Sequence, residues 1–165
     1  MGNPFIYEPA DFVPVRDLET CRKVRSISSD DISKHSNPDL SISVVPDGDI
    51  AFRRINDIFH RIKKSDDEDT PLVLILPQPH PQYIKVAYLI NKYRVNCRNL
   101  YTFNMDEWAD EEGNSAPETW SRGFMYAMLN NFFYRIDEDL RPPRAQVQGP
   151  TSNNINEYGK MIAEL

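Results

Sequence analysis

The sequence contains few cysteines, no long apolar run and no excess of positive charge. Its two cysteines, Cys21 and Cys97, have no nearby Cys or His at metal-ligand spacing, so neither a disulfide framework nor a metal site is predicted. No stretch approaches the roughly 18 consecutive apolar residues of a membrane-spanning helix. Residues 1–10 lack the basic region and apolar run of a secretory signal. We therefore expect a cytoplasmic protein.

The charge balance is acidic, because 25 Asp and Glu residues oppose 19 Lys and Arg residues and leave a net charge of −6. Nucleic acids and anionic membranes attract basic surfaces, so neither is an expected partner. Short basic runs at 22–25 and 61–64 are soon followed by acidic residues and are interpreted as solvated faces. The 165 residues, 40% of them hydrophobic, suffice for the core of one domain.

Residues 1–39 differ in composition from the rest of the chain. They hold four prolines and a polar tract at 26–37. Residues 17–25 are predicted to form a short helix, with Asp17 as its N-cap. We interpret 1–39 as an N-terminal extension that packs on the core or on a neighbouring subunit, and we place the domain at 40–165.

From residue 40 onward, strand and helix patterns alternate. A period of two or a continuous apolar run predicts strands at 40–45, 72–76 and 99–103. The strand at 72–76 is expected to be central and covered on both faces. Apolar residues at three- and four-residue steps predict one helix that begins at 47–49 and reaches Ile62. The same spacing predicts three more helices, at 83–93, 117–136 and 154–165. This alternation predicts βαβ units and a parallel sheet. The last helix has no Gly or Asn cap, and three strands make a thin core, so we expect the front part of a longer protein.

Two acids, Asp106 and Glu107, follow the strand at 99–103 after Asn104 and Met105. Ligands of open α/β sheets lie beyond the carboxyl ends of the strands. A partly desolvated carboxylate at that edge can shuttle protons. The alternative is that Asp106 only caps the following turn. The acids at 110–112 lack the spacing of a calcium loop and are interpreted as solvated.

The other connection of interest is the loop at 77–82, Pro-Gln-Pro-His-Pro-Gln, which follows the most apolar strand. It contains no glycine, and its three prolines have no N–H to donate. A phosphate cradle made of backbone amides is therefore not predicted. His80 is a candidate ligand for an anion or a hydroxyl, and the alternative is an exposed loop histidine.

Four motifs together resemble a known family. They are Leu-Tyr-Thr-Phe-Asn-Met-Asp-Glu-Trp at 100–108, Pro-Glu-Thr-Trp at 117–120, Phe-Met at 124–125 and Asn-Asn-Phe-Phe at 130–133. The glucosamine-6-phosphate deaminase/isomerase family typically has Val-Thr-Phe-Asn-Met-Asp-Glu-Tyr, Pro-Glu-Ser-Tyr, Ser-Phe-Met and Asn-Phe-Phe in the same order. The resemblance runs from about residue 40 to the C-terminus. It implies a Rossmann-like α/β fold, shared with ribose-5-phosphate isomerase and 6-phosphogluconolactonase, of which 40–165 is the N-terminal part.

The resemblance also implies an activity, the conversion of glucosamine 6-phosphate to fructose 6-phosphate and ammonia by proton transfer between C2 and C1. By that match Asp106 is the base and Glu107 its supporting neighbour. The residues expected to bind substrate are Asn104, Gln78, His80 and Gln82. A small sugar phosphate is the expected partner, a homo-oligomer is expected on family grounds, and no cofactor or metal is expected.

Two departures from the family pattern leave alternatives open. The loop at 77–82 replaces the Gly- and Thr-rich phosphate loop, and the family's second motif, with the histidine that opens the sugar ring, does not occur before Leu165. Catalysis is therefore expected of a full-length protein. The alternatives are a non-catalytic sugar-phosphate-binding regulatory module, and a divergent sugar isomerase or lactonase of the same superfamily.

Overall fold

The structure, a computed structural model, describes residues 16–165. The chain divides into two compact units, 1–46 and 47–165, and each is considered by itself. Within the described part of the chain, no helix combines the length and apolar character needed to cross a bilayer. The predicted domain boundary between residues 39 and 40 stays a prediction.

The described part of the first unit contains helix α1 (Leu18–Arg25). Its start is as predicted, because the Asp17 carboxylate accepts hydrogen bonds from the backbone N–H groups of Glu19 and Thr20, at 3.0 and 3.1 Å. The predicted strand at 40–45 is wrong, since these residues have no regular secondary structure. No strand among residues 16–165 pairs with them, and an extended segment without a partner leaves its backbone groups unpaired.

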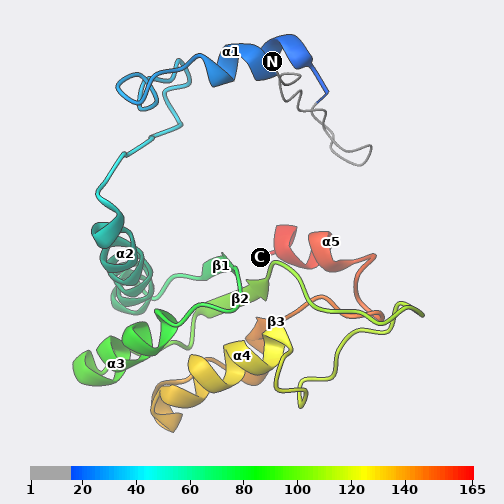
Figure 1. The fold of residues 1–165 in the computed structure, drawn as a ribbon. Coiled ribbons are helices and arrows are strands. Elements are labelled where there is room, and N and C mark those ends of the chain that lie inside the picture. The colour runs from blue at the N-terminus through cyan, green and yellow to red at the C-terminus, as the bar shows by residue number, and fades with distance from the viewer. Residues whose placement is uncertain (1–15) are drawn as a thin grey trace. The chain divides into compact units, whose positions relative to one another are not determined.

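The second unit is built on a parallel sheet with strand order β1-β2-β3 (Figure 1). Strands β1 (Leu72–Leu76) and β2 (Leu100–Asn104) pair over their full length, and β2 also pairs with β3 (Val147–Gln148). The predicted α/β class with a parallel sheet is confirmed. Strand β3 was not predicted, because two residues are too few to carry a period.

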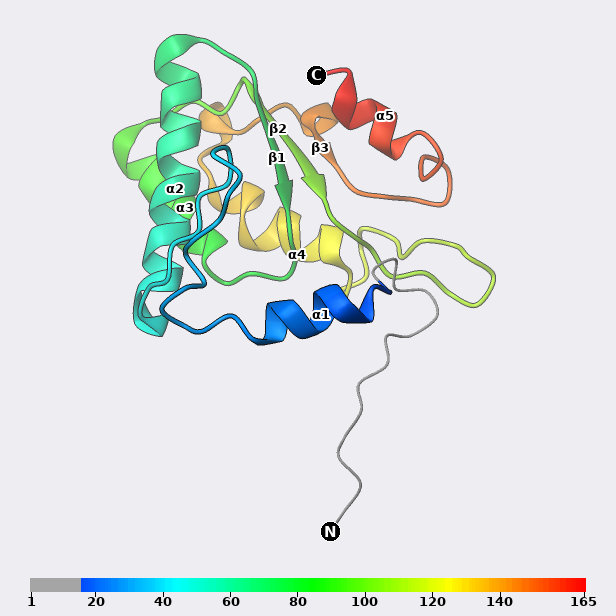
Figure 2. The same cartoon turned by 90° about the horizontal axis from the view of Figure 1, so that it is seen from above.

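Helices flank this sheet. They are α2 (Asp47–Glu68), α3 (Tyr83–Tyr93), α4 (Phe124–Asn131) and α5 (Tyr158–Ala163), with three short 3-10 turns, Phe133–Arg135, Glu138–Leu140 and Arg144–Gln146. Figure 2 shows α2 and α3 side by side, as their contacts require. Helix α2, predicted to reach Ile62, continues through the acidic stretch to Glu68. There the pairs Lys63–Asp67 and Lys64–Glu68 are spaced to support a helix.

The two faces of the sheet are covered unequally. On one face Leu76 and Leu100 pack into the main core with residues of α2, α3 and α4. On the other face Phe103 contacts the ring of Tyr158 from α5, with ring centroids 5.6 Å apart. β1 lies at the edge of the described sheet, and Ile75 is 53% exposed. The expectation that 72–76 is a central strand covered on both faces is therefore wrong.

An aromatic stack joins α3 to the end of α4. Phe132 is fully buried and stacks on Tyr83 and on Phe133, with ring centroids 5.3 and 4.7 Å apart. The Tyr83 hydroxyl donates a hydrogen bond to the carbonyl oxygen of Pro77, at 2.9 Å. Burial raises the pKa of Tyr83 to about 12. This contact holds the start of the 77–82 loop against the core.

The two cysteines differ in accessibility, which gives a test of the core. Cys97 is 1% exposed, and burial, together with nearby Asp66, raises the pKa of its thiol to about 12. Because only the thiolate is alkylated rapidly, we expect iodoacetamide at pH 8 to modify the half-buried Cys21 of the native protein and to leave Cys97 intact. Peptide mass spectrometry with and without denaturant measures this, and rapid modification of Cys97 in the native state would contradict the burial.

Candidate functional site

The candidate site lies at the carboxyl edge of the sheet. Leu76 and Asn104 are register partners at the ends of the parallel strands β1 and β2. The loop at 77–82 and the segment that begins at Met105 therefore leave the same edge of the sheet. The predicted site residues on both connections accordingly share one end of the fold.

Glu107 connects this edge to helix α4. One carboxylate oxygen accepts the N–H of Phe124 at 2.9 Å, and the other accepts the N–H of Met125 at 2.7 Å. The N–H of Trp108 donates to the first oxygen, also at 2.9 Å. The first N–H groups of a helix have no partner within it, and a carboxylate satisfies them and complements the helix dipole.

This contact explains why α4 begins at Phe124 and not at the predicted Pro117. Residues 117–123 form turns instead, with the N–H of Trp120 bonded to Pro117 and the N–H of Gly123 bonded to Trp120. Gly123, at the N-cap, has no side chain to supply the cap. A Cβ there would lie 3.2 Å from the carbonyl oxygen of Trp120. The cap therefore comes from Glu107, which is distant in sequence.

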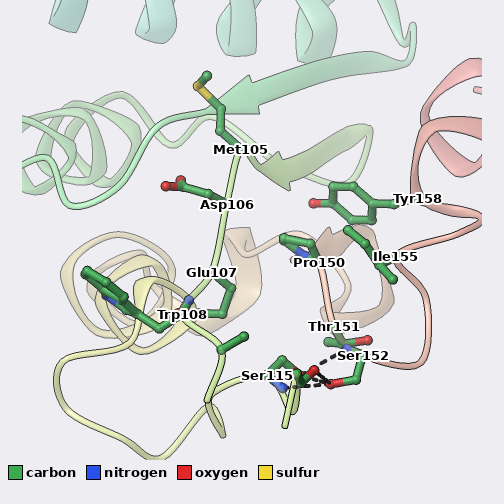
Figure 3. A pocket seen from close by; sticks show the side chains of 12 residues that line it. Met105, Asp106, Glu107, Trp108, Ser115, Pro150, Thr151, Ser152, Ile155 and Tyr158 are labelled. Atoms are coloured by element: carbon green, nitrogen blue, oxygen red, sulfur yellow. Dashed lines mark hydrogen bonds between the residues drawn. The ribbon is translucent and has the colours of Figure 1, made fainter. Parts of the chain in front are cut away.

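Asp106 lies at the rim of a cavity of about 330 Å³. Its side chain is exposed, and no hydrogen bond or ion pair joins its carboxylate to any of residues 16–165. Met105, Glu107 and Trp108 also line the cavity. Figure 3 shows the Asp106 carboxylate directed away from Tyr158. It is thus accessible from solvent, with the cavity beside it.

The opposite wall of the cavity comes from the segment at 150–158, which sequence reasoning did not assign to the site. The Tyr158 hydroxyl donates to the carbonyl oxygen of Asn104 at 2.8 Å. Burial raises the pKa of Tyr158, so the hydroxyl stays protonated. The helix predicted at 154–165 begins only at Tyr158, and no motif in this polar stretch marks it as a wall of the site.

The segment at 108–116 is a hairpin, joined by an antiparallel bridge between Ala109 and Ser115. Gly113 adopts a φ of 83° at its turn, a conformation that suits glycine. The Ser152 hydroxyl accepts a hydrogen bond from the N–H of Ser115 at 2.7 Å. It donates one to the carbonyl oxygen of Gly113 at 3.0 Å. The acids at 110–112 are exposed, but their loop is attached to the opposite wall (Figure 3).

A second group of side chains gathers at the loop after β1. The Nη1 atom of Arg54, from α2, lies 2.9 and 2.8 Å from the two ring nitrogens of His80. The Nδ1 atom of His80 lies 3.0 Å from the Oε1 atom of Gln82. Arg54 was not predicted to belong to the site. It is a basic residue of an amphipathic helix, and its neighbours in sequence do not indicate that it contacts the loop at 77–82.

The backbone amides that begin α3 do not form a cradle for an anion. The N–H groups of Tyr83, Ile84 and Lys85 each donate to a carbonyl oxygen of the preceding loop, at 3.2, 3.3 and 2.9 Å. These three amides are therefore already bonded within the loop. Any anion held here would bind to side chains.

The other two predicted residues, Asn104 and Gln78, do not line the cavity, and Asn104 is buried whereas Gln78 is half-buried. Asn104 is 1% exposed, and neither polar atom of its side chain has a partner among the described residues. The Gln78 Oε1 atom is likewise buried without a partner, while its Nε2 atom lies 3.3 Å from the sulfur of Met128. Gly149 packs closely here, since a Cβ would lie 2.8 Å from the Met125 methyl group.

The structure thus brings the predicted residues into separate places. Asp106 and Glu107 share one cavity, and His80 contacts both Arg54 and Gln82. The Asn104 amide and the Gln78 Oε1 atom are buried without a partner among the described residues. Among residues 16–165, no three His, Cys, Asp or Glu side chains are grouped to hold a metal ion.

Comparisons with known proteins find similarity to glucosamine-6-phosphate deaminases, the family that the motifs resemble. No protein-family model matches the chain. It is 31% identical over 109 residues to the glucosamine-6-phosphate deaminase of Dictyostelium discoideum, a match that covers 64% of this chain and 38% of the relative. The solved structure of a monomeric glucosamine-6-phosphate deaminase, called a missing link of the NagB superfamily, matches with a TM-score of 0.52 and 18% identity. That match covers 68% of this chain and 47% of the other. The chain therefore spans less than half the length of these relatives.

The capping role of Glu107 can be tested by Glu107→Gln. The substitution keeps one oxygen acceptor but removes the charge and one acceptor from the start of α4. We expect the free energy of unfolding to fall by about 1–3 kcal/mol, the range for a lost hydrogen bond to a charged group. Urea unfolding measures this, with Glu111→Gln as the matched control because Glu111 is exposed. Equal stability of the two variants would show that the cap contributes little.

Proposed function

We propose that this chain, whose resemblance to the glucosamine-6-phosphate deaminase family is confirmed in sequence and in fold, supplies the proton-transfer part of an amino-sugar phosphate deaminase. The substrate is glucosamine 6-phosphate, and the products are fructose 6-phosphate and ammonia. One observation carries the proposal: the Asp106 carboxylate, free of hydrogen bonds to residues 16–165, stands beside a cavity at the carboxyl edge of the sheet.

The chemistry requires one group that takes a proton from C2 of the opened sugar and returns it at C1. This transfer converts an aldose amine into a ketose imine, which water then hydrolyses. A base must reach the C–H bond without competing partners. Asp106 is exposed and has none among the described residues. Glu107 is unsuited to this task, because both of its oxygens accept N–H groups from α4. Asp106 is thus the base, and Glu107 is a positioning residue.

The phosphate group calls for positive charge, which the Asp106 cavity does not offer. Its lining residues include no Lys, Arg or His of the described chain. Arg54, on α2 beside the loop after β1, supplies that charge and hydrogen-bond donors instead, and a ring nitrogen of His80 accepts one of its N–H groups. A guanidinium group has five N–H donors, so contact with His80 leaves others for phosphate oxygens. Gln82 orients His80 in this arrangement. Substrate binding by Asn104 and Gln78 stays a prediction.

A second candidate function is a non-catalytic module that binds a sugar phosphate. The observation that favours it is the glycine-free loop, whose helix amides are bonded internally. Such a module needs the phosphate site but no free carboxylate. Homo-oligomerisation and a cytoplasmic location also stay predictions, and the solved relative is itself described as monomeric.

Replacing the proposed base tests the activity. In the full-length protein encoded by the reading frame, Asp106→Asn is expected to lower ammonia release from glucosamine 6-phosphate by about 10²–10⁴-fold, the usual contribution of a general base. Glu111→Gln removes the same charge from the adjacent hairpin and should leave the rate unchanged. Wild-type activity in Asp106→Asn would exclude Asp106 as the base. Sugar-phosphate binding without turnover by the wild type would favour the non-catalytic module.

The proposed phosphate contact is tested separately by Arg54→Gln. Loss of a charge-assisted hydrogen bond of about 1.5–3 kcal/mol should raise KM for glucosamine 6-phosphate roughly 10- to 100-fold, with a much smaller change in kcat. Arg53→Gln is the matched control, because Arg53 neighbours it on α2 and is exposed. An unchanged KM in Arg54→Gln would place the phosphate elsewhere.

A further inference from the structure

The two tryptophans of the chain lie at one place in the structure. Trp108 and Trp120 both line a second cavity, of about 360 Å³. Their side chains are 54% and 41% exposed. Large aromatic side chains dominate buried contacts in most proteins, and exposed apolar clusters mark sites of binding. The proposed deaminase chemistry assigns no role to this cavity.

The walls of the cavity are held in place by main-chain hydrogen bonds. Trp108 donates its N–H to Glu107 and accepts the N–H of Ala116 at 2.8 Å. Its ring also packs on Phe124, with centroids 5.6 Å apart. Trp120 closes a turn through its N–H to Pro117, at 2.9 Å. Both indoles are therefore carried by hydrogen-bonded segments, so little order need be gained when a ligand binds.

The cavity is also negatively charged. Asp110 lines it, and the Asp110 carboxylate accepts the backbone N–H of Asn114 at 2.7 Å and the side-chain amide of Asn114 at 3.0 Å. These hydrogen bonds lower the pKa of Asp110, so the carboxylate is ionised at neutral pH. The residues of the described chain that line this cavity include no Lys, Arg or His.

The adjoining cavity adds to this potential. It shares Trp108, Ala109 and Ser115 with the tryptophan cavity and carries the Asp106 and Glu107 carboxylates. An anion, such as a phosphate group, would meet the Asp106 and Asp110 carboxylates, and no Lys, Arg or His among residues 16–165 lines either cavity. A cation would be attracted both by the carboxylates and by the negative faces of the indole rings.

We propose that the cavity between Trp108 and Trp120 binds an organic ammonium group, which packs against the indole rings and pairs with the Asp110 carboxylate. An aromatic cage with an acid is a known way to bind such cations. A neutral sugar ring would use the indole faces but would gain nothing from Asp110. The inference does not depend on the deaminase activity, because the cavity can bind a cation whether or not Asp106 is a base.

The direct test compares two probes of the same shape. Choline carries a quaternary ammonium group, and 3,3-dimethylbutan-1-ol is its neutral isostere. We expect calorimetry of the whole chain to show saturable choline binding at least tenfold tighter than binding of the isostere, about 1.4 kcal/mol. Tryptophan fluorescence should change over the same range of choline concentration, because both tryptophans of the chain line the cavity. Equal binding of the two probes, or no choline binding, would overturn the proposal.

Variants locate the binding. Asp110→Asn should weaken choline binding about tenfold, or ~1.4 kcal/mol, whereas Glu111→Gln, on the same turn but not lining the cavity, should leave it unchanged. Asp110→Asn also removes hydrogen bonds within the hairpin, so a second variant is needed. Trp120→Leu changes a cavity residue outside the hairpin and should also weaken choline binding. Unchanged choline affinity in Trp120→Leu would overturn the assignment. Tighter binding of glucose than of choline would also overturn the assignment and would indicate a neutral sugar site.

Discussion

The site depends above all on the bond between the Glu107 carboxylate and the first turn of α4. Through it, the end of strand β2, the start of a helix and the first residue of the 108–116 hairpin are held at one point. A carboxylate directed into a helix N-terminus has little freedom to turn toward solvent. Its neighbour Asp106 is carried by the same backbone but has no such bond. Two adjacent acids of the same chemistry thus serve different purposes, because only one of them is engaged by a helix.

Much of the fold follows from the sequence, and the failures have physical causes. Apolar runs placed β1 and β2, and helical periodicity placed α3, because each of these elements is long enough to carry its own pattern. The strand at 40–45 alternates correctly but finds no neighbour among the described residues. β3 is too short to carry a pattern. The start of α4 is set by a residue distant in sequence, which no local rule detects.

The same division holds for the site. Asp106 and Glu107 were predicted because they lie just beyond the end of a strand, so local order fixes their place. Arg54 reaches His80 only after α2 has packed beside α3. The opposite wall at 150–158 arrives from the far end of the chain. Asn104 was predicted to bind substrate on its motif alone, whereas the alternation of β2 turns its side chain into the protein. Such features depend on tertiary packing and cannot be read from spacing.

The hydroxyl of Tyr158 has a consequence for how the site responds to disturbance. It joins α5 to the last carbonyl oxygen of β2, the residue just before the segment that carries the acids. Ser152, on the same stretch of chain, holds the hairpin at Gly113 and Ser115. Detachment of this one short segment would therefore remove a wall of the cavity and release its loop in a single step. Opening of the pocket is thereby coupled to undocking of α5 through the hydrogen bonds of Tyr158 and Ser152.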